Sequence, residues 1–531
     1  MIQKKYILIS SLLLSGFLSF TSCDKNLDIK PTSELESVYF QTEERMQRGV
    51  GASYAALTNL YGPQLNESTQ YGFWLLPGDD ITADGSGNNL ETFSGLNGSS
   101  GLVDGVWKRM YAVIARCNFM LEKIADPKVA EVYVTEGMKD ANRGEMLFLR
   151  SYAFYKLWDW YRKAPIQDER VKSITDALLT PSAGFEMLDN AIASLEEAAL
   201  ILPDSWDSKN LGRITKDGAN GLLVKCYVMR ACYENKNAEY YTKAIAAFNK
   251  ISSSRKLVKF GDNFDYRTEN NEESLFEFQA SHAPAQDNAW LNNDFGGDVG
   301  QMGAFYHYFD GHWGNYTSGI FGPTQKLVNA FDAADPRKSE TLSDDADNVG
   351  WKLWWITPKW DKFNGYQMVK YRNGAKGDCN DNTWSLSSSN NPRILRFADV
   401  KLAVAEAYLA TGKTTEALQQ VNDIRERARK STADGVEAAA PAALAAVTMN
   451  DIMNERFLEL AGEEGHRWSD LRRWHAAGYI NLGSWTSTDF GFPYASNLFA
   501  FDVNKNLLYP IPISELDRNP NMAASGNNPG Y

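Results

Sequence analysis

Histidine and cysteine are scarce in this chain of 531 residues, with five of each. There is no C-x-x-C pair, so the usual redox and zinc motifs are absent. The motifs H-E-x-x-H and G-x-S-x-G and the phosphate-binding Walker loop are also missing. A basic excess is lacking too, since 54 lysines and arginines face 67 acidic residues, for a net charge of −13. These absences argue against a nucleic-acid-binding protein and supply no motif for an enzyme.

Long apolar runs are confined to the N-terminus. Two lysines precede an apolar stretch from Tyr6 to Phe20, which is short for a bilayer span and typical of a signal peptide. Small residues then lead to Cys23. We interpret residues 1–22 as a bacterial lipoprotein signal peptide, Cys23 as the lipidated residue and residues 23–33 as a polar tether. An ordinary secretory signal followed by an incidental Cys23 is the alternative.

Export would permit disulfides among the other cysteines. Cys117 and Cys226 lie among apolar residues at helical spacing, and Cys226 and Cys232 are on one expected helix but point in different directions. We therefore expect buried free thiols.

Apolar residues recur at helical spacing through most of the first half and again near residue 400. We predict helices over Glu43–Leu60, Val103–Ile124, Gly144–Tyr161, Phe185–Leu200, Lys216–Tyr233, Tyr240–Ile251, Phe397–Leu409 and Thr415–Arg429. The last two resemble a tetratricopeptide-type pair with Gly412 at the turn, and about four such pairs are expected. The pairs are not contiguous, so the predicted fold class is mostly α, with tetratricopeptide-like helix pairs forming a scaffold around a long insertion.

The expected insertion is rich in glycine, asparagine, aspartate and aromatic residues. Short strands are predicted at Ser274–Ala280 and within Lys359–Tyr371. Loop regions at 66–101 and 485–504 have a similar character, and long loops of this kind usually carry function. The expected organisation is one domain over residues 34–531, with the scaffold in 34–251 and 393–480 and the loop-rich, ligand-binding insertion in 252–392.

Nine charged residues are set among apolar helix positions. A buried charge is tolerable only when it is paired, so we expect these side chains to join helices through ion pairs. A catalytic carboxylate among them is the alternative. The nine are Arg150, Arg213, Arg396, Glu455, Arg456, Glu459, Arg467, Asp470 and Arg473.

Adjacent carboxylates occur at Asp79-Asp80 and at Glu463-Glu464. A glycoside hydrolase needs two carboxylates that flank one bond, and adjacency in sequence does not provide this. We expect solvated or hydrogen-bonding roles for both pairs, and no catalysis. Oxygen-rich clusters at 344–348 and 378–381 could hold a structural calcium ion, but neither fits the calcium-loop motif, so no cofactor is expected.

Eight blocks, in order along nearly the whole chain, resemble the SusD/RagB family of outer-membrane nutrient-binding lipoproteins. They lie at 27–33, 107–124, 144–152, 202–215, 396–407, 422–428, 455–474 and 510–531. The resemblance implies a lipid-anchored protein at the outer face of an outer membrane. It also implies that the protein captures an oligosaccharide and delivers it to a SusC-like, TonB-dependent transporter, over which it sits as a lid.

The loops contain the residue types that bind sugars, because aromatic rings stack on the C–H face of a sugar while amides and carboxylates satisfy its hydroxyls. Starch-binding members of the family use such residues from the first loop region and from the insertion. By that analogy we predict ligand contacts by Trp74, Asp80, Asn89, Trp290, Trp313 and Tyr316. For each aromatic, core packing under a long loop is the alternative.

Three other functions stay open. The loops would also suit a peptide ligand, which makes a peptide-binding lid the first alternative. A surface glycoside hydrolase is the second, and a purely structural lid that binds the barrel and no free ligand is the third.

Overall fold

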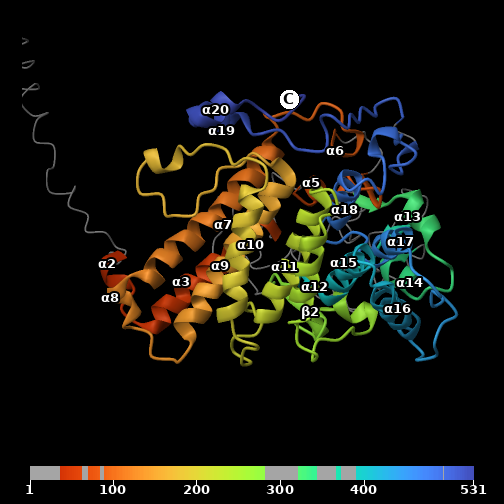
Figure 1. Cartoon of the computed structure of the whole chain (residues 1–531), viewed down its shortest axis with the longest axis horizontal. Coiled ribbons are helices and arrows are strands. Elements are labelled where there is room, and N and C mark those ends of the chain that lie inside the picture. The colour runs from red at the N-terminus through yellow and green to blue at the C-terminus, as the bar shows by residue number, and fades with distance from the viewer. Residues whose placement is uncertain are drawn as a thin grey trace, which may run out of the picture.

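The structure is a computed structural model that describes residues 36–61, 70–83, 89–280, 321–343, 366–371, 390–493 and 496–531. Figure 1 shows long helices side by side, with short helices and loops gathered along one edge. In the first half the helices are α2 (Glu36–Tyr39), α3 (Glu43–Ala55), α4 (Thr58–Tyr61), α5 (Gln70–Leu75), α6 (Asn89–Thr92), α7 (Gly101–Ala125), α8 (Pro127–Ala130), α9 (Met138–Tyr161), α10 (Glu186–Ile201), α11 (Lys216–Tyr233) and α12 (Ala238–Phe248). They are followed by α13 (Gln325–Ala330), α14 (Arg337–Thr341), α15 (Phe397–Ala410), α16 (Thr414–Lys430), α17 (Met449–Glu459), α18 (His466–Ala476), α19 (Ile513–Arg518) and α20 (Pro520–Ser525).

The long helices pack as pairs. Helix α9 packs on α10, α11 on α12 and α15 on α16, while α3 and α7 pack together and α7 continues the row onto α9. Contacts of α10 with α11 and of α12 with α15 join the pairs into one scaffold. The mostly α fold and the helix pairs are therefore confirmed.

One predicted helix is interrupted. The expected helix over Glu43–Leu60 ends at Ala55, and α4 follows it at Thr58. The N–H groups of Ala56 and Leu57 donate to carbonyls three residues back, those of Ser53 and Tyr54. This tighter turn separates α3 from α4. The two residues of this break, Ala56 and Leu57, are both buried.

Among the described residues, six short strands form three antiparallel pairs. They are β1 (Ile81–Ala83) with β3 (Phe321–Pro323), β2 (Ser274–Glu277) with β6 (Arg393–Arg396), and β4 (Leu342–Ser343) with β5 (Gln367–Met368). The pair β2–β6 brings the beginning and the end of the insertion together. The pair β1–β3 joins the first loop region to the insertion, with Ile81 opposite Pro323. The insertion also contains helices α13 and α14, which its composition did not predict.

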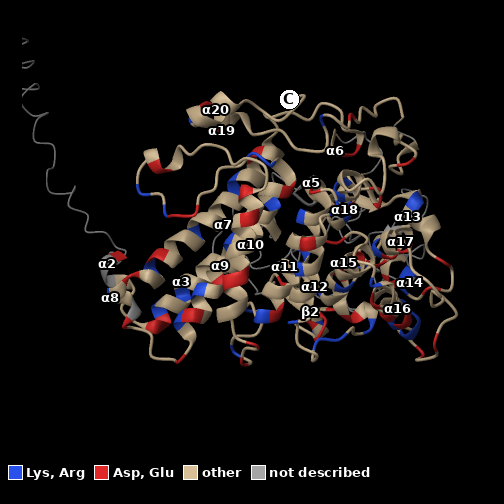
Figure 2. Cartoon of the chain, in the orientation of Figure 1, with Lys and Arg blue, Asp and Glu red and all other residues tan. Residues whose placement is uncertain are grey.

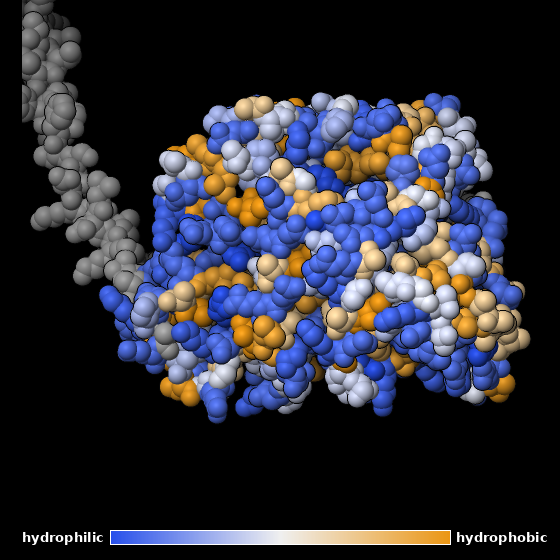
Figure 3. Space-filling view, viewed as in Figure 1, coloured by the Kyte–Doolittle hydropathy of each residue, from blue (hydrophilic) through white to orange (hydrophobic). Residues whose placement is uncertain are grey.

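The expectation of buried free thiols is confirmed for Cys117, Cys226 and Cys232, whereas Cys379 lies outside the described residues. Charges of both signs are interspersed along the helices in Figure 2. Hydrophilic side chains cover most of the face in Figure 3, with small separated apolar patches. Within the described part of the chain, no helix combines the length and the apolar character that a membrane crossing needs.

Candidate functional site

Trp74 lies in the core beneath the loop edge. Its ring stacks on that of Trp160 from α9, with centroids 5.9 Å apart and an interplanar angle of 3°. Tyr61 packs on another side at 6.2 Å, and Trp74 is only 4% exposed. Its ring therefore presents no open face on which a sugar could stack, and the structure gives this residue the packing role considered above. The predicted ligand contact by Trp74 draws no support from this geometry.

Asp79 joins three separate segments. Its carboxylate accepts from Nζ of Lys326 on α13 at 2.6 Å, and from Nη2 and Nε of Arg467 on α18, the former at 3.0 Å. Burial alone would raise the pKa of Asp79, but Arg467 and Lys326 outweigh that effect and hold the pKa below its usual value. Of the two roles expected for this carboxylate pair, Asp79 thus has the hydrogen-bonding one.

Asp80 is buried beside it, with an exposure of 2%. One carboxylate oxygen accepts the N–H of Gly462 at 2.9 Å, whereas Oδ1 has no hydrogen-bond partner among the described residues. Burial raises the pKa of Asp80 to about 6, the Gly462 N–H opposes the rise, and the charge of Asp79 adds to it. In this position Asp80 does not reach a surface at which a sugar hydroxyl could bind, so its predicted contact also lacks geometric support.

Asn89 is exposed at the start of α6. Nearby, Phe93 packs edge-on against Phe490 and Phe501, with ring centroids 5.3 and 4.8 Å away. The N–H of Ala500 donates to the Thr92 carbonyl at 2.8 Å, which fixes the 485–504 loop against α6. The first and third loop regions therefore meet here, and the sequence did not predict that they would.

This meeting place brings aromatic rings of the 485–504 loop to α6, at whose start the Asn89 amide is exposed. Trp485, Phe499 and Phe501 are half-buried, so each keeps part of its ring accessible. We call Asn89, Trp485, Phe499 and Phe501 the loop face. The loop composition was the only sequence signal that could have selected the last three. Trp290, Trp313 and Tyr316 lie outside the described residues, as do both calcium-type clusters.

The nine charges expected in the interior all have polar partners there, and most of these partners are charged. Arg396 of β6 contacts Glu273 at 2.5 Å, Glu459 at 3.1 Å and Glu463 at 2.7 Å. Burial raises the pKa of Glu459, but Arg427, Arg396 and Arg337 together lower it to about 2. Eight of the nine form ion pairs, and Arg150 instead donates to Oδ1 of Asn118 at 2.9 Å and to the Asp168 carbonyl. The expected ion pairing is therefore confirmed for eight of these residues and not for Arg150.

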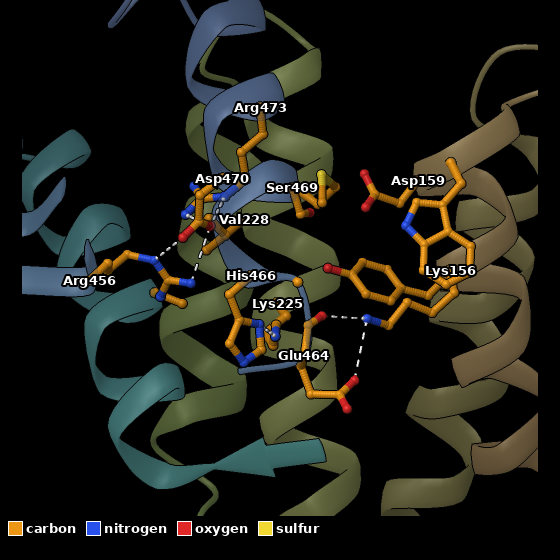
Figure 4. Close-up of a pocket in the computed structure, with 15 residues that line it drawn as sticks. Lys156, Asp159, Lys225, Val228, Arg456, Glu464, His466, Ser469, Asp470 and Arg473 are labelled. Atoms are coloured by element: carbon orange, nitrogen blue, oxygen red, sulfur yellow. Dashed lines mark hydrogen bonds and ion pairs between the residues drawn. The ribbon is translucent and has the colours of Figure 1, made fainter. Parts of the chain in front are cut away.

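A second polar cluster surrounds an internal cavity between α9, α11 and α18 (Figure 4). Lys225 Nζ lies 2.6 Å from Asp399 and 3.2 Å from Nδ1 of His466, and Glu464 accepts from the Tyr61 hydroxyl at 2.9 Å. Burial lowers the pKa of His466 and raises that of Glu464. Such shifts also mark active sites, but the cavity holds only about 20 Å³, which is room for one water and not for a substrate. Among the described residues, no group of three His, Cys, Asp or Glu side chains is placed to hold a metal ion.

Comparison with known proteins identifies the family profiles and relatives that this chain resembles. The profile of the SusD family matches residues 357–531, and a profile described as starch-binding and associating with the outer membrane matches residues 25–228. SusD-like protein P2 of Formosa agariphila is 26% identical, over the full length of both chains.

Two solved structures show the same fold. A SusD homologue from Bacteroides thetaiotaomicron superposes with a TM-score of 0.74 at 20% identity, covering 94% of this chain and 99% of its own. Surface glycan-binding protein A of that organism, in complex with laminarihexaose, superposes with a TM-score of 0.67 at 20% identity, covering 92% of this chain and 99% of its own.

The scaffold and the loop face together define a helical-repeat protein whose loops lie along one edge. The two profiles match the two ends of the chain and jointly cover more than half of the sequence. The chain belongs to the SusD/RagB family.

Proposed function

We propose that this protein is an outer-membrane lipoprotein that binds an oligosaccharide at the cell surface, without catalysis. Its lipid would be attached at Cys23, and it would deliver the glycan to a SusC-like, TonB-dependent transporter as that barrel's lid. The likeness to a surface glycan-binding protein that holds laminarihexaose carries this proposal. The loop face supports it, because partly accessible aromatic rings and an exposed amide are the groups that sugars need.

Isothermal titration calorimetry tests the binding. The soluble form beginning at Asp24 is titrated with plant, host and microbial oligosaccharides and with mixed peptides. We expect one glycan class to bind, and we expect Asn89→Ala to weaken that binding roughly tenfold, because one good hydrogen bond contributes about 1 kcal/mol or more. The matched control is Asn249→Ala at the exposed end of α12, which should bind normally.

The insertion is tested by Trp313→Ala and by deletion of the loop around it. Both should abolish capture while membrane association continues. Trp74→Ala is a different kind of variant, because Trp74 is buried and a large cavity would lower stability by about 3–5 kcal/mol. Its titration is interpretable only beside a thermal unfolding curve. Binding of peptides alone would replace the glycan by a peptide ligand.

Two further measurements test the anchor and the absence of catalysis. Cys23→Ala should abolish incorporation of radiolabelled palmitate and release the protein from the membrane fraction. Incubation with each bound glycan should release no reducing ends. Steady release that persists on repurification would make the protein a hydrolase.

A further inference from the structure

Lys326 of α13 lies where the three loop-rich parts of the chain meet. Its Nζ donates to Oδ2 of Asp79, in the first loop region, at 2.6 Å and to the carbonyl of Asp489, in the 485–504 loop, at 2.7 Å. Lys326 itself belongs to the insertion. The same Nζ lies 4.5 Å from the ring centroid of Trp485, a member of the loop face. One ammonium group therefore joins the insertion and the first loop region to an aromatic ring of the loop face.

These contacts leave Lys326 little capacity to bind a ligand. A lysine side chain has three N–H donors and no acceptor. Two donors are directed at Asp79 and Asp489, and the cation is attracted to the face of the Trp485 ring. The side chain is 35% exposed, so it lies at the edge of the loop face and not deep beneath it. Its geometry is that of a group that holds its neighbours in place.

Helix α13 is itself fixed on the first loop region. Thr324, the N-cap of α13, accepts the Leu327 N–H at 3.2 Å. The Thr324 N–H donates to the Asp80 carbonyl at 2.9 Å, and its hydroxyl donates to the Asp79 carbonyl at 2.7 Å. The start of the helix is therefore anchored at two points, and the Lys326 side chain extends from a fixed base.

Trp485, by contrast, lies on an exposed turn. Ser484 and Thr486 on either side of it are exposed, and Trp485 is half-buried. The Asp489 carboxylate closes the turn by accepting from the N–H and the hydroxyl of Thr486 at 2.7 and 2.8 Å. The Trp485 ring packs edge-on against Phe490, with centroids 5.1 Å apart. Phe490 and Lys326 therefore define the orientation of a ring that its sequence neighbours leave free to turn.

We propose that Lys326 is a positioning residue of the loop face, which holds the Trp485 ring in the orientation that stacks on a sugar of the bound glycan. This inference rests on the proposed function, because the glycan is the ligand proposed there. A ring that is already fixed loses less conformational freedom when the ligand binds, and the affinity is higher for that reason. Lys326 acts through Trp485 and makes no contact with the sugar itself.

Fluorine NMR on the purified protein, without ligand, tests the ring position. Fluorinated tryptophan replaces all 15 tryptophans, and the Trp485 resonance is the one that Trp485→Phe removes. We expect Lys326→Met to shift and broaden this resonance. Lys326→Arg should largely restore it, because a guanidinium also donates to oxygens and stacks on aromatic rings. An unchanged Trp485 resonance in a folded Lys326→Met variant would overturn the proposal.

Lys413→Met is the matched control for the fluorine experiment. Nζ of Lys413 also lies over an aromatic ring, 5.9 Å from the centroid of Tyr408, but at the turn between α15 and α16. This variant removes a lysine of the same kind from the scaffold and should leave the Trp485 resonance unchanged. A shift as large as that of Lys326→Met would show that the resonance reports general loosening, and would also count against the proposal.

Calorimetry with the bound glycan tests the consequence for affinity. Lys326→Met should weaken binding roughly threefold to tenfold. It should have no further effect in a protein that already carries Trp485→Ala, because both substitutions act on the same stacked ring. Losses that simply add in the double variant would overturn the proposal, since Lys326 would then act through Asp79 or touch the ligand directly.

Failure of the proposed function gives a different pattern. If the parent protein binds none of the oligosaccharides, the proposed function is overturned, and with it the sugar as the partner of Trp485. The fluorine resonance of the free protein then decides alone whether Lys326 positions the ring. If the parent binds a glycan and Lys326→Met binds it equally well, the proposed function stands and the positioning role of Lys326 is overturned.

Discussion

Asp80 is a buried carboxylate whose ionised form is poorly compensated. Burial raises its pKa from 3.8 to about 6, so the folded protein holds this proton more tightly than the unfolded chain does. The stabilisation that comes from the protonated form is complete below the unfolded pKa, and it is lost as the pH rises through about 6. At neutral pH the charged side chain therefore lowers the free energy of unfolding.

We expect Asp80→Asn to stabilise the protein at pH 7, because asparagine keeps an acceptor for the Gly462 N–H and carries no charge. A shift of two pKa units corresponds to at most roughly 3 kcal/mol. Urea unfolding between pH 4 and pH 7 measures the effect, and the variant should also lose part of the pH dependence in that range. Asp204→Asn, at a carboxylate whose side chain is 84% exposed, is the control with little expected change. A destabilised Asp80→Asn at pH 7 would contradict this account.

Glu459 has the opposite electrostatic environment. It lies between Arg337, at 3.0 Å, and Arg396, at 3.1 Å, and it also contacts Arg427. We expect Glu459→Gln to cost about 3–5 kcal/mol, because it leaves buried guanidinium groups without their counter-charge. Denaturant unfolding at pH 7 measures this loss. The matched control is Glu426→Gln, which breaks an exposed pair with Lys430 and should change stability by under about 0.5 kcal/mol. Equal effects of the two variants would show that the interior ion pairs contribute no more to the free energy of unfolding than surface pairs do.

The interior charges could be predicted from sequence because physical chemistry leaves few alternatives. A charge at an apolar helix position must find a partner, as Arg473 does with Glu406 at 2.5 Å. The partner itself lies 67 positions away, and nothing local identifies it. Trp74, in contrast, is a residue whose position could not be predicted from the sequence. An aromatic residue in a loop region is equally compatible with a sugar contact and with the core, and only the stack on Trp160 decides its place.

At the scale of elements, glycines explain two of the turns. Gly412, between α15 and α16, has φ of +77°, and a Cβ there would meet no atom within 4 Å. Gly465, just before α18, has φ of +63°, and its Cβ would lie 2.6 Å from the backbone oxygen of Trp74. The first turn needs glycine for its conformation alone. The second also needs it for the close approach of α5.

We therefore expect Gly412→Ala to cost about 1 kcal/mol, which is the price of the left-handed conformation for alanine. Gly465→Ala should cost roughly 3 kcal/mol or more, because it adds a backbone clash to the same strain. Thermal unfolding of the two variants side by side provides the comparison. A second readout is the near-ultraviolet circular dichroism of the stacked Trp74 and Trp160, which only Gly465→Ala should alter. Similar losses in both variants would contradict the close-approach argument.

Helices were predictable where apolar periodicity was long, and the expected Lys216–Tyr233 coincides with α11. The short strands show why other elements could not be predicted from the sequence. The pair β1–β3 joins Thr82 to Gly322, which lie 240 positions apart, and each strand has only three residues. Such short segments carry no periodic signal of their own. The meeting of α6 with the 485–504 loop is equally nonlocal, and for that reason the loop face emerged only from the structure.

For the whole molecule, the question is whether the helix pairs unfold singly, as solenoid repeats can, or together. The C-terminal segments contact the scaffold at several separate points. Arg472 of α18 pairs with Asp159 of α9 at 2.8 Å, and the Tyr509 N–H donates to the Trp160 carbonyl at 2.9 Å. Arg337 of the insertion contacts Glu455 of α17 at 2.6 Å. These long-range contacts favour a single cooperative unit over independent repeats.

The three buried thiols make this testable, because they are divided between two helix pairs. Cys117 is on α7, where burial raises its pKa to about 12, and Cys226 and Cys232 are on α11. A thiol that is both buried and protonated does not react with iodoacetamide, so each of the three should be alkylated only after its helix opens. Peptide mass spectrometry across a urea series then gives one midpoint for each thiol. We expect the midpoints to coincide, because α7 packs on α9, and α9 is also joined to α18 through Asp159 and to Tyr509 through Trp160. An earlier midpoint for Cys117 than for Cys232 would instead show that the N-terminal pair unfolds alone and that the C-terminal contacts stabilise only α11 and its neighbours.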